Sequence, residues 1–76
     1  MRKIKLIWDF RGLDAMETAR HHARHLKEFS IKENLHFYEI DIQERNPMLY
    51  CAFITVNESD MKVFRDALQP HRGELA

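Results

Sequence analysis

Alternation of polar and apolar residues near the start of the chain is the feature that most limits its fold. Residues 2–10 read RKIKLIWDF, and Ile4, Leu6, Trp8 and Phe10 all share one parity. A period of two is typical of a β-strand that buries one face, because successive side chains of a strand point to opposite sides. We therefore expect residues 2–10 to form a half-buried strand.

A helical pattern follows this strand. Asp14 and Glu17 are spaced as in a capping box, which predicts a helix over residues 15–33. At about 100° per residue, one side of this helix collects small and apolar side chains. They are Ala15, Met16, Ala19, Ala23, Leu26 and Ser30. The alanines favour close packing of the helix on a sheet.

Two further strands and a second helix are predicted downstream. Residues 35–43 and 49–57 are rich in aromatic and β-branched residues, and an Asn-Pro turn signal between them favours a hairpin. Pairing Tyr38 with Ile54, and Ile40 with Ala52, points the even-numbered residues of 49–57 inward. Asn57 predicts the start of a helix over 58–69, which Pro70 ends. Residues 70–76 are expected to be a loose tail, and a short helical or an extended ending is left open.

This order of elements predicts a single α+β domain over residues 1–76. A right-handed crossover gives a three-stranded antiparallel sheet, in spatial order 1-3-2, with both helices on one face. The chain thus resembles the ferredoxin-like superfold without its last strand. Its IWDFRG stretch is similar to the first strand of small uncharacterised bacterial α/β proteins. Because the superfold hosts many unrelated functions, the resemblance implies no activity.

Composition limits the class of function. Twelve basic residues balance twelve acidic ones, which removes the broad positive field of most nucleic-acid binders. The single cysteine, Cys51, cannot form an internal disulfide, and the first ten residues lack the apolar core of a signal peptide. We therefore expect a cytoplasmic protein that binds neither membrane nor nucleic acid.

The stretch ARHHARH, residues 19–25, holds three histidines. His21 and His25 lie one helical turn apart and can approach one metal ion, with Glu28 as a conceivable third ligand. His22 points about 100° away and cannot join them. Basic neighbours oppose a cation, so we expect no metal and no cofactor. Protonation of the pair instead predicts lower stability at about pH 5.5 than at about pH 7.5.

No catalytic residue is predicted. Cys51 lies within a strand, where a thiol is usually inert, and the two glycines are isolated, so no phosphate-binding loop exists. The leading hypothesis is a binding or interaction module without chemistry of its own. The alternative is a small dimeric enzyme or small-molecule binder with a pocket between sheet and helices. That pocket would be lined by Trp8, Phe10, His22 and Tyr38.

The sheet face away from the helices is the predicted interaction surface. It should carry three apolar residues in its centre, lysines along one edge and acids along the other. These are Ile7, Phe37 and Phe53, then Lys3 and Lys5, then Glu39 and Asp41. A two-fold axis parallel to the strands would lay the lysines of one copy over the acids of the other. We therefore predict a homodimer through this face, and zero net charge disfavours the alternative of an RNA-binding face.

Overall fold

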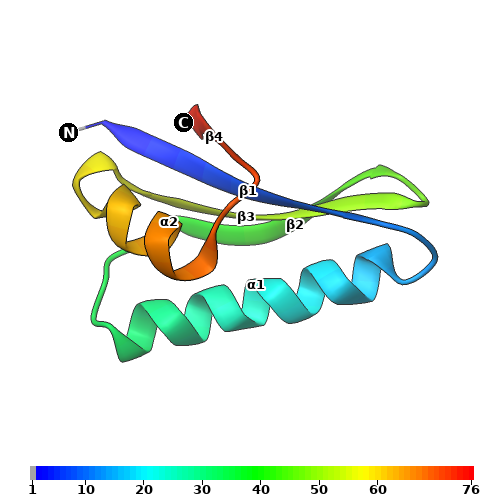
Figure 1. Ribbon diagram of the computed structural model, residues 1–76, viewed down its shortest axis with the longest axis horizontal. Coiled ribbons are helices and arrows are strands. Elements are labelled where there is room, and N and C mark those ends of the chain that lie inside the picture. Colours follow the sequence, from blue (N-terminus) through cyan, green and yellow to red (C-terminus); the bar gives the residue numbers. More distant parts are fainter. Residues whose placement is uncertain (1) are drawn as a thin grey trace.

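The computed structural model describes residues 2–76 and has two layers, a four-stranded antiparallel sheet and two α-helices that cover one of its faces (Figure 1). The α+β class is thus confirmed. No helix in residues 2–76 is long and apolar enough to cross a membrane. In chain order the elements are β1 (Lys3–Arg11), α1 (Ala15–Lys32), β2 (Glu39–Asn46), β3 (Leu49–Asn57), a 3-10 turn (Glu58–Asp60), α2 (Met61–Leu68) and β4 (Arg72–Leu75).

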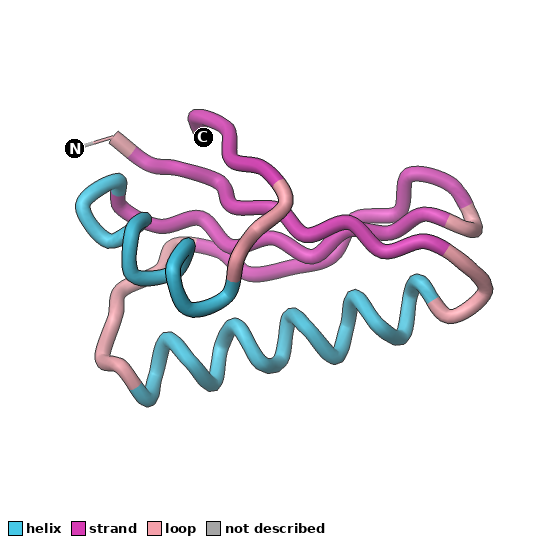
Figure 2. The backbone as a smooth tube through the Cα atoms, viewed as in Figure 1, coloured by secondary structure: helices cyan, strands magenta, loops and turns pink. Residues whose placement is uncertain are grey.

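The sheet contains one strand more than the sequence predicts. Its order is β2-β3-β1-β4, so β4 adds to the outside of β1. Residues 72–75 pair with residues 4–7, and Figure 2 shows the loop that rises from α2 to this edge. The prediction of three strands is therefore wrong, and the end of the tail, for which the sequence leaves a helical or an extended form open, is extended. β4 gave no signal because its four residues, RGEL, are all exposed and show no apolar alternation.

The register between β2 and β3 differs from the predicted one by two residues. Ile40 pairs with Ile54 and Ile42 with Ala52, so the same side chains still face the helices. The inward parity of β3 is confirmed, because Ala52, Ile54 and Val56 all lie in the main core. The pairing is irregular just before β2. There the N–H of Tyr38 donates a hydrogen bond to the Thr55 carbonyl, although Glu39 is the residue opposite Thr55 in the register. Tyr38 and Glu39 therefore both lie opposite Thr55, as two residues of one strand lie opposite one residue of its partner in a β-bulge.

This irregular pairing exchanges the places predicted for Phe37 and Tyr38. β2 begins at Glu39, not at residue 35, so the alternation does not extend back through these two positions. Phe37 packs against the core between sheet and helices. The ring of Tyr38 instead lies 4.2 Å from the Lys3 ammonium, and its hydroxyl donates to Oδ1 of Asn57. The prediction that put Phe37 on the open face and Tyr38 on the inner face is wrong.

The main core lies between the sheet and both helices. β1 contributes Ile4, Leu6 and Trp8, α1 contributes Ala19 and Leu26, α2 contributes Phe64, and β3 contributes Ala52, Ile54 and Val56. Ala19 is fully buried, so α1 lies close to the sheet. His22 follows Ala19 by three residues and precedes Leu26 by four, which holds its ring at the border of this core.

The ends of the helices explain how the chain returns to β1. α1 begins at Ala15 as predicted, although the Asp14 side chain makes no capping hydrogen bond. The predicted second helix starts as a 3-10 turn, and α2 ends at Leu68. Gln69 then adopts the left-handed conformation, with φ of 47°, ahead of Pro70. This reversal directs His71 toward the edge of β1, where its N–H donates to the Ile7 carbonyl at 2.9 Å.

Candidate functional site

The sheet face away from the helices is covered by the protein's own charged side chains. Ile7, Cys51 and Phe53 form a second, small cluster there, and Ile7 and Phe53 are only 0% and 7% exposed. The Lys5 ammonium lies 4.1 Å above the Phe53 ring. A cation held over an aromatic face is a favourable contact that also shields the ring. The expectation of exposed apolar residues in the centre of this face is therefore wrong.

β4 also changes the charge pattern of this face. Arg72 lies opposite Ile7 and Glu74 opposite Lys5, so the lysines do not line an edge of the sheet. Glu39 and Asp41 are exposed on β2, the strand at the other edge. The predicted contact between the lysine edge of one copy and the acidic edge of the other is therefore not supported. The homodimer through this face stays a prediction, without the exposed apolar surface on which it was based.

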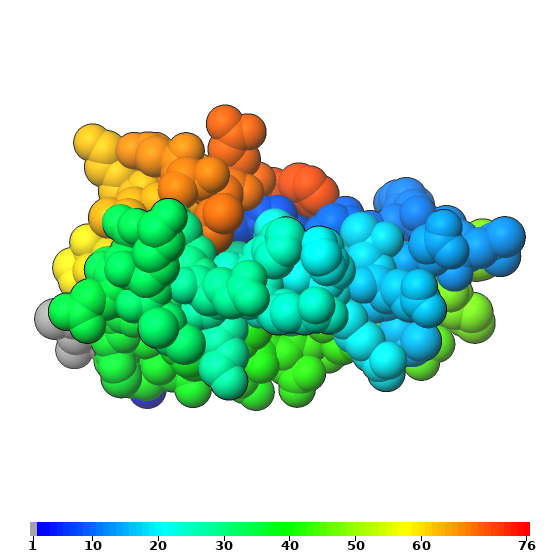
Figure 3. All heavy atoms as spheres, turned by 90° about the horizontal axis from the view of Figure 1, so that it is seen from below, coloured from blue at the N-terminus to red at the C-terminus, as the bar shows by residue number. Residues whose placement is uncertain are grey.

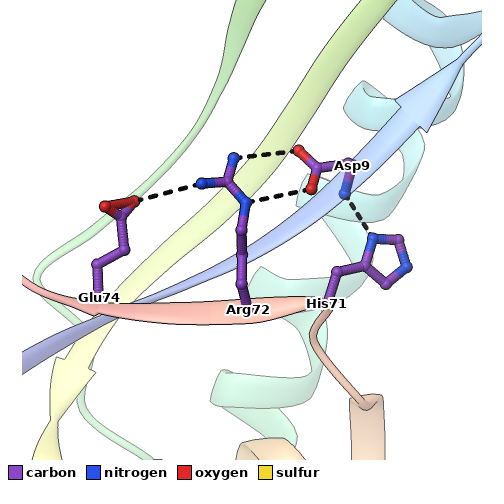
Figure 4. Close-up of polar contacts among 4 residues, drawn as sticks. All are labelled: Asp9, His71, Arg72 and Glu74. Atoms are coloured by element: carbon purple, nitrogen blue, oxygen red, sulfur yellow. Dashed lines mark hydrogen bonds and ion pairs between the residues drawn. The ribbon is translucent and has the colours of Figure 1, made fainter.

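Both edges of the sheet have an N–H group that is capped by a nearby side chain. On β2, the Asp41 carboxylate accepts a hydrogen bond of 2.8 Å from the N–H of Ile42. On β1, beyond the end of β4, Nδ1 of His71 accepts one of 2.8 Å from the N–H of Asp9 (Figure 4). Unpaired N–H groups at a sheet edge are templates for an added strand. These two bonds therefore oppose pairing with another chain.

Arg72 ties β4 to β1 through an ion pair. Its guanidinium donates two hydrogen bonds of 3.2 Å to the Asp9 carboxylate, and Nη1 lies 3.7 Å from the Glu74 carboxylate (Figure 4). The hydrogen bonds from Arg72 hold the pKa of Asp9 below its usual value, and they raise the pKa of Arg72 in turn. Together with the His71 bond, they fix residues 71–72 against β1.

An aromatic group lies where β1, α1 and the segment before β4 meet. Trp8 and Phe10 come from β1, His22 from α1 and His71 from the segment, and we name these four residues the histidine notch. The ring centre of His22 lies 4.7 Å from that of Trp8 and 5.5 Å from that of Phe10. Phe10 and His71 are 6.4 Å apart. In Figure 3, β1 (blue) stays visible between α1 (cyan) and the red-orange segment that follows α2.

Trp8 forms the closed floor of the histidine notch. It is 3% exposed, packs with Ala19 and Ala23, and donates from Nε1 to the Leu68 carbonyl at 2.8 Å. A tryptophan packed in this way leaves no deep pocket between sheet and helices. The notch is therefore a shallow surface feature, bordered by the rings of Phe10, His22 and His71.

Three of the four residues predicted to line that pocket nevertheless lie together. Trp8, Phe10 and His22 come together as expected, because strand parity and helical angle bring them to one side. Tyr38 lies on the other face of the sheet, beside Lys3, and does not join them. His71 takes the fourth place. His71 was not predicted because it lies in the expected tail, and its position after Pro70 is the only signal in the sequence.

His22 holds a buried nitrogen without a hydrogen-bond partner, its Nε2 atom. Burial of the imidazole lowers the pKa of His22, and the nearby charges of His25, His71 and His21 lower it further. The ring is therefore neutral near pH 7. Leaving a buried polar atom unpaired costs about 1–3 kcal/mol. Most buried polar atoms in folded proteins are paired, so this nitrogen calls for an explanation.

His71 offers a hydrogen-bond donor of fixed position. Because its Nδ1 accepts a hydrogen bond from the Asp9 N–H, the neutral ring must carry its proton on Nε2. In Figure 4 the second ring nitrogen points away from Asp9. The notch thus includes an N–H donor from His71 and the unpaired nitrogen of His22.

His21 and His25, the predicted metal-binding pair, have ring centres 4.2 Å apart. Among residues 2–76, however, no three His, Cys, Asp or Glu side chains are arranged to hold a metal ion, so Glu28 does not complete a site. A shallow depression of about 550 Å³ on α1 shares no residue with the histidine notch. It is lined by Asp14, Glu17, Thr18, Arg20, His21 and Arg24. Its mixed charges favour no single ligand.

Comparison with protein-family models, with curated proteins and with solved structures found no match to the chain. The function must therefore be argued from the geometry of the site. The IWDFRG stretch takes part in that geometry, because it contributes Trp8 and Phe10 to the histidine notch and Asp9 to the ion pair with Arg72.

Proposed function

We propose that this protein is a small cytoplasmic binding module without catalytic activity, on a ferredoxin-like scaffold. The order of its elements, βαββαβ, is that of the ferredoxin-like fold, and this supports the scaffold. The free, buried thiol of Cys51 supports a reducing compartment. The binding site of the proposal is the histidine notch.

The unpaired Nε2 of His22 is the observation that carries this proposal. An apolar side chain would pack beside Trp8 and Phe10 without leaving a polar atom unpaired. Sites where a protein breaks such a local rule are often sites of function. A ligand that bonds to this nitrogen would offset the cost of keeping it there.

The His22 ring can reach such a ligand. The side chain is partly exposed at the border of the core, while Nε2 itself is buried. In the described structure no hydrogen bond restrains the ring, so rotation about its Cβ–Cγ bond can bring a nitrogen toward the rim. A ligand would therefore bind together with a turn of the imidazole.

The surroundings of the notch favour binding over catalysis. An imidazole becomes a catalytic base when it activates a nearby nucleophile. The Cys51 thiol is buried on the opposite face of the sheet, beside Ile7 and Phe53. The hydroxyl groups of Thr18 and Ser30 on α1 both donate to backbone carbonyls, those of Asp14 and Leu26.

Ligand-observed NMR with a fragment library tests the proposed function. We expect a set of fragments whose signals broaden with the native protein and not with the His22→Leu variant. His21→Leu, which changes a histidine outside the notch, should behave as the native protein does. Amide spectra confirm that both variants are folded. If no fragment distinguishes the native protein from His22→Leu, the proposal is wrong.

A further inference from the structure

We propose that the histidine notch binds a planar organic anion, such as an aromatic carboxylate, whose acid group accepts a hydrogen bond from Nε2–H of His71. The aromatic part of the anion lies against Phe10 and His22. This inference rests on the proposed function and adds the chemical class of the ligand.

The Nε2–H group of His71 is a hydrogen-bond donor, and it favours a ligand group that accepts hydrogen bonds. Nδ1 is occupied by the Asp9 N–H, and the backbone N–H of His71 is held by the Ile7 carbonyl. The imidazole is thus fixed in position and in tautomer before any ligand arrives. Such a fixed N–H favours a group that only accepts hydrogen bonds, which describes an ionised carboxylate.

Phe10 supplies a surface for a flat ring. It is partly exposed, and its ring centre lies 5.5 Å from that of His22 and 6.4 Å from that of His71. Aromatic rings pack against each other in offset or tilted pairs, with centres about 4.5–7 Å apart. A planar ligand can therefore contact Phe10 while its acid group reaches His71.

The charges around the notch favour an anion. The residues of α1 about one turn from His22 on its own side are Thr18, Ala19, His25 and Leu26, and none of them is acidic. On β1, the Asp9 carboxylate is already held by two hydrogen bonds from Arg72. His71 is the titratable group of the segment before β4 that acts on His22. No unpaired carboxylate among these groups repels an anion, and a cation at the notch meets the imidazoles of His22 and His71, with His25 one turn along α1.

Binding of an anion should also change the protonation of His22. Its imidazole is neutral in the free protein because it is buried beside other basic groups. The acid group is bound at His71, whose charge acts on His22, and a negative charge there favours the imidazolium form of His22. The pKa of His22 should therefore rise on binding, and affinity should increase as the pH falls from about 7.5 to 6.

The test is a titration of the ¹⁵N-labelled protein, with EDTA present, followed through the histidine ring signals. The probes are benzoate, its neutral analogue benzamide and its cationic analogue benzylamine. We expect benzoate to shift the ring signals of His22 and His71 and to bind about tenfold or more tightly than either analogue. Inorganic phosphate should not match benzoate, because it lacks the planar part.

Variants locate the contact. His71→Asn keeps an acceptor for the Asp9 N–H but removes the Nε2–H donor, and we expect it to weaken benzoate binding about tenfold. His21→Asn should leave the affinity unchanged. If His71→Asn does not fold, the contrast between benzoate and benzamide in the native protein still decides the question.

The outcomes separate this inference from the proposed function. If benzamide or benzylamine binds in the notch as tightly as benzoate, the anion class is wrong, although the notch is still a binding site. Equal binding of phosphate would refute the planar ligand. If none of these probes and no library fragment binds at His22, both proposals fail.

Discussion

His22 keeps a polar nitrogen at a place where an apolar side chain would avoid an unpaired atom. The alternation of residues in β1 predicted that Trp8 and Phe10 would lie beside His22. The angular spacing of residues around α1 predicted that the His22 side chain would point toward them. The missing partner of Nε2 was not predictable, because it depends on how α1, β1 and the loop after α2 meet. His71 could not be predicted for the same reason, since nothing in HRGELA indicates a strand that brings it to Asp9.

The lowered pKa of His22 predicts how stability depends on pH. The unfolded chain binds a proton at its ordinary pKa of about 6.5, and the folded protein binds it only at lower pH. The contribution of neutral His22 is therefore complete above about pH 6.5 and is lost as the pH falls below that value. We expect urea unfolding to show lower stability at pH 5.5 than at pH 7.5.

The His22→Leu variant is the control for this pH dependence. It should lose less stability than the native protein over the same interval, because the buried group that must protonate is gone. An equal loss in both proteins would assign the effect to groups other than His22.

Elements with a strong apolar period were predictable, and those held by other forces were not. β1, α1 and β3 have the expected parity because each buries a regular set of side chains in the main core. β2 starts four residues later than predicted, since its pairing becomes irregular at Tyr38. β4 buries no side chain, and it is held by backbone pairing and by polar contacts of His71 and Arg72.

Asp9→Asn tests the attachment of β4. The variant keeps the size of the side chain but replaces the charged carboxylate, whose two oxygens accept hydrogen bonds from Arg72, by a neutral amide. Because the ion pair is partly exposed, we expect a loss of about 1 kcal/mol in the free energy of unfolding, measured in urea. Glu74→Gln, which changes the weaker and more exposed contact of Arg72, should cost less. Equal losses would show that the Asp9 pair does not hold β4.

Across the whole molecule, parts of the open face and of both sheet edges are occupied by side chains of the chain itself. The apolar cluster of the open face is buried, with Lys5 above the Phe53 ring, and one N–H group of β2 and one of β1 beyond the end of β4 are capped by Asp41 and His71. The homodimer through that face stays a prediction. The histidine notch is the place where packing leaves a polar atom unpaired, and there we place the function.

The free energy of unfolding of His22 variants, compared with that of the native protein at pH 7.5, tests this account most directly. Replacing the imidazole by Leu or Phe removes the unpaired Nε2, so the better-packed variant should be more stable, by about 1 kcal/mol, while it loses the fragments that the native protein binds. His21→Leu should change neither property. If both His22 variants are less stable than the native protein, the imidazole serves the fold, and the central claim is contradicted.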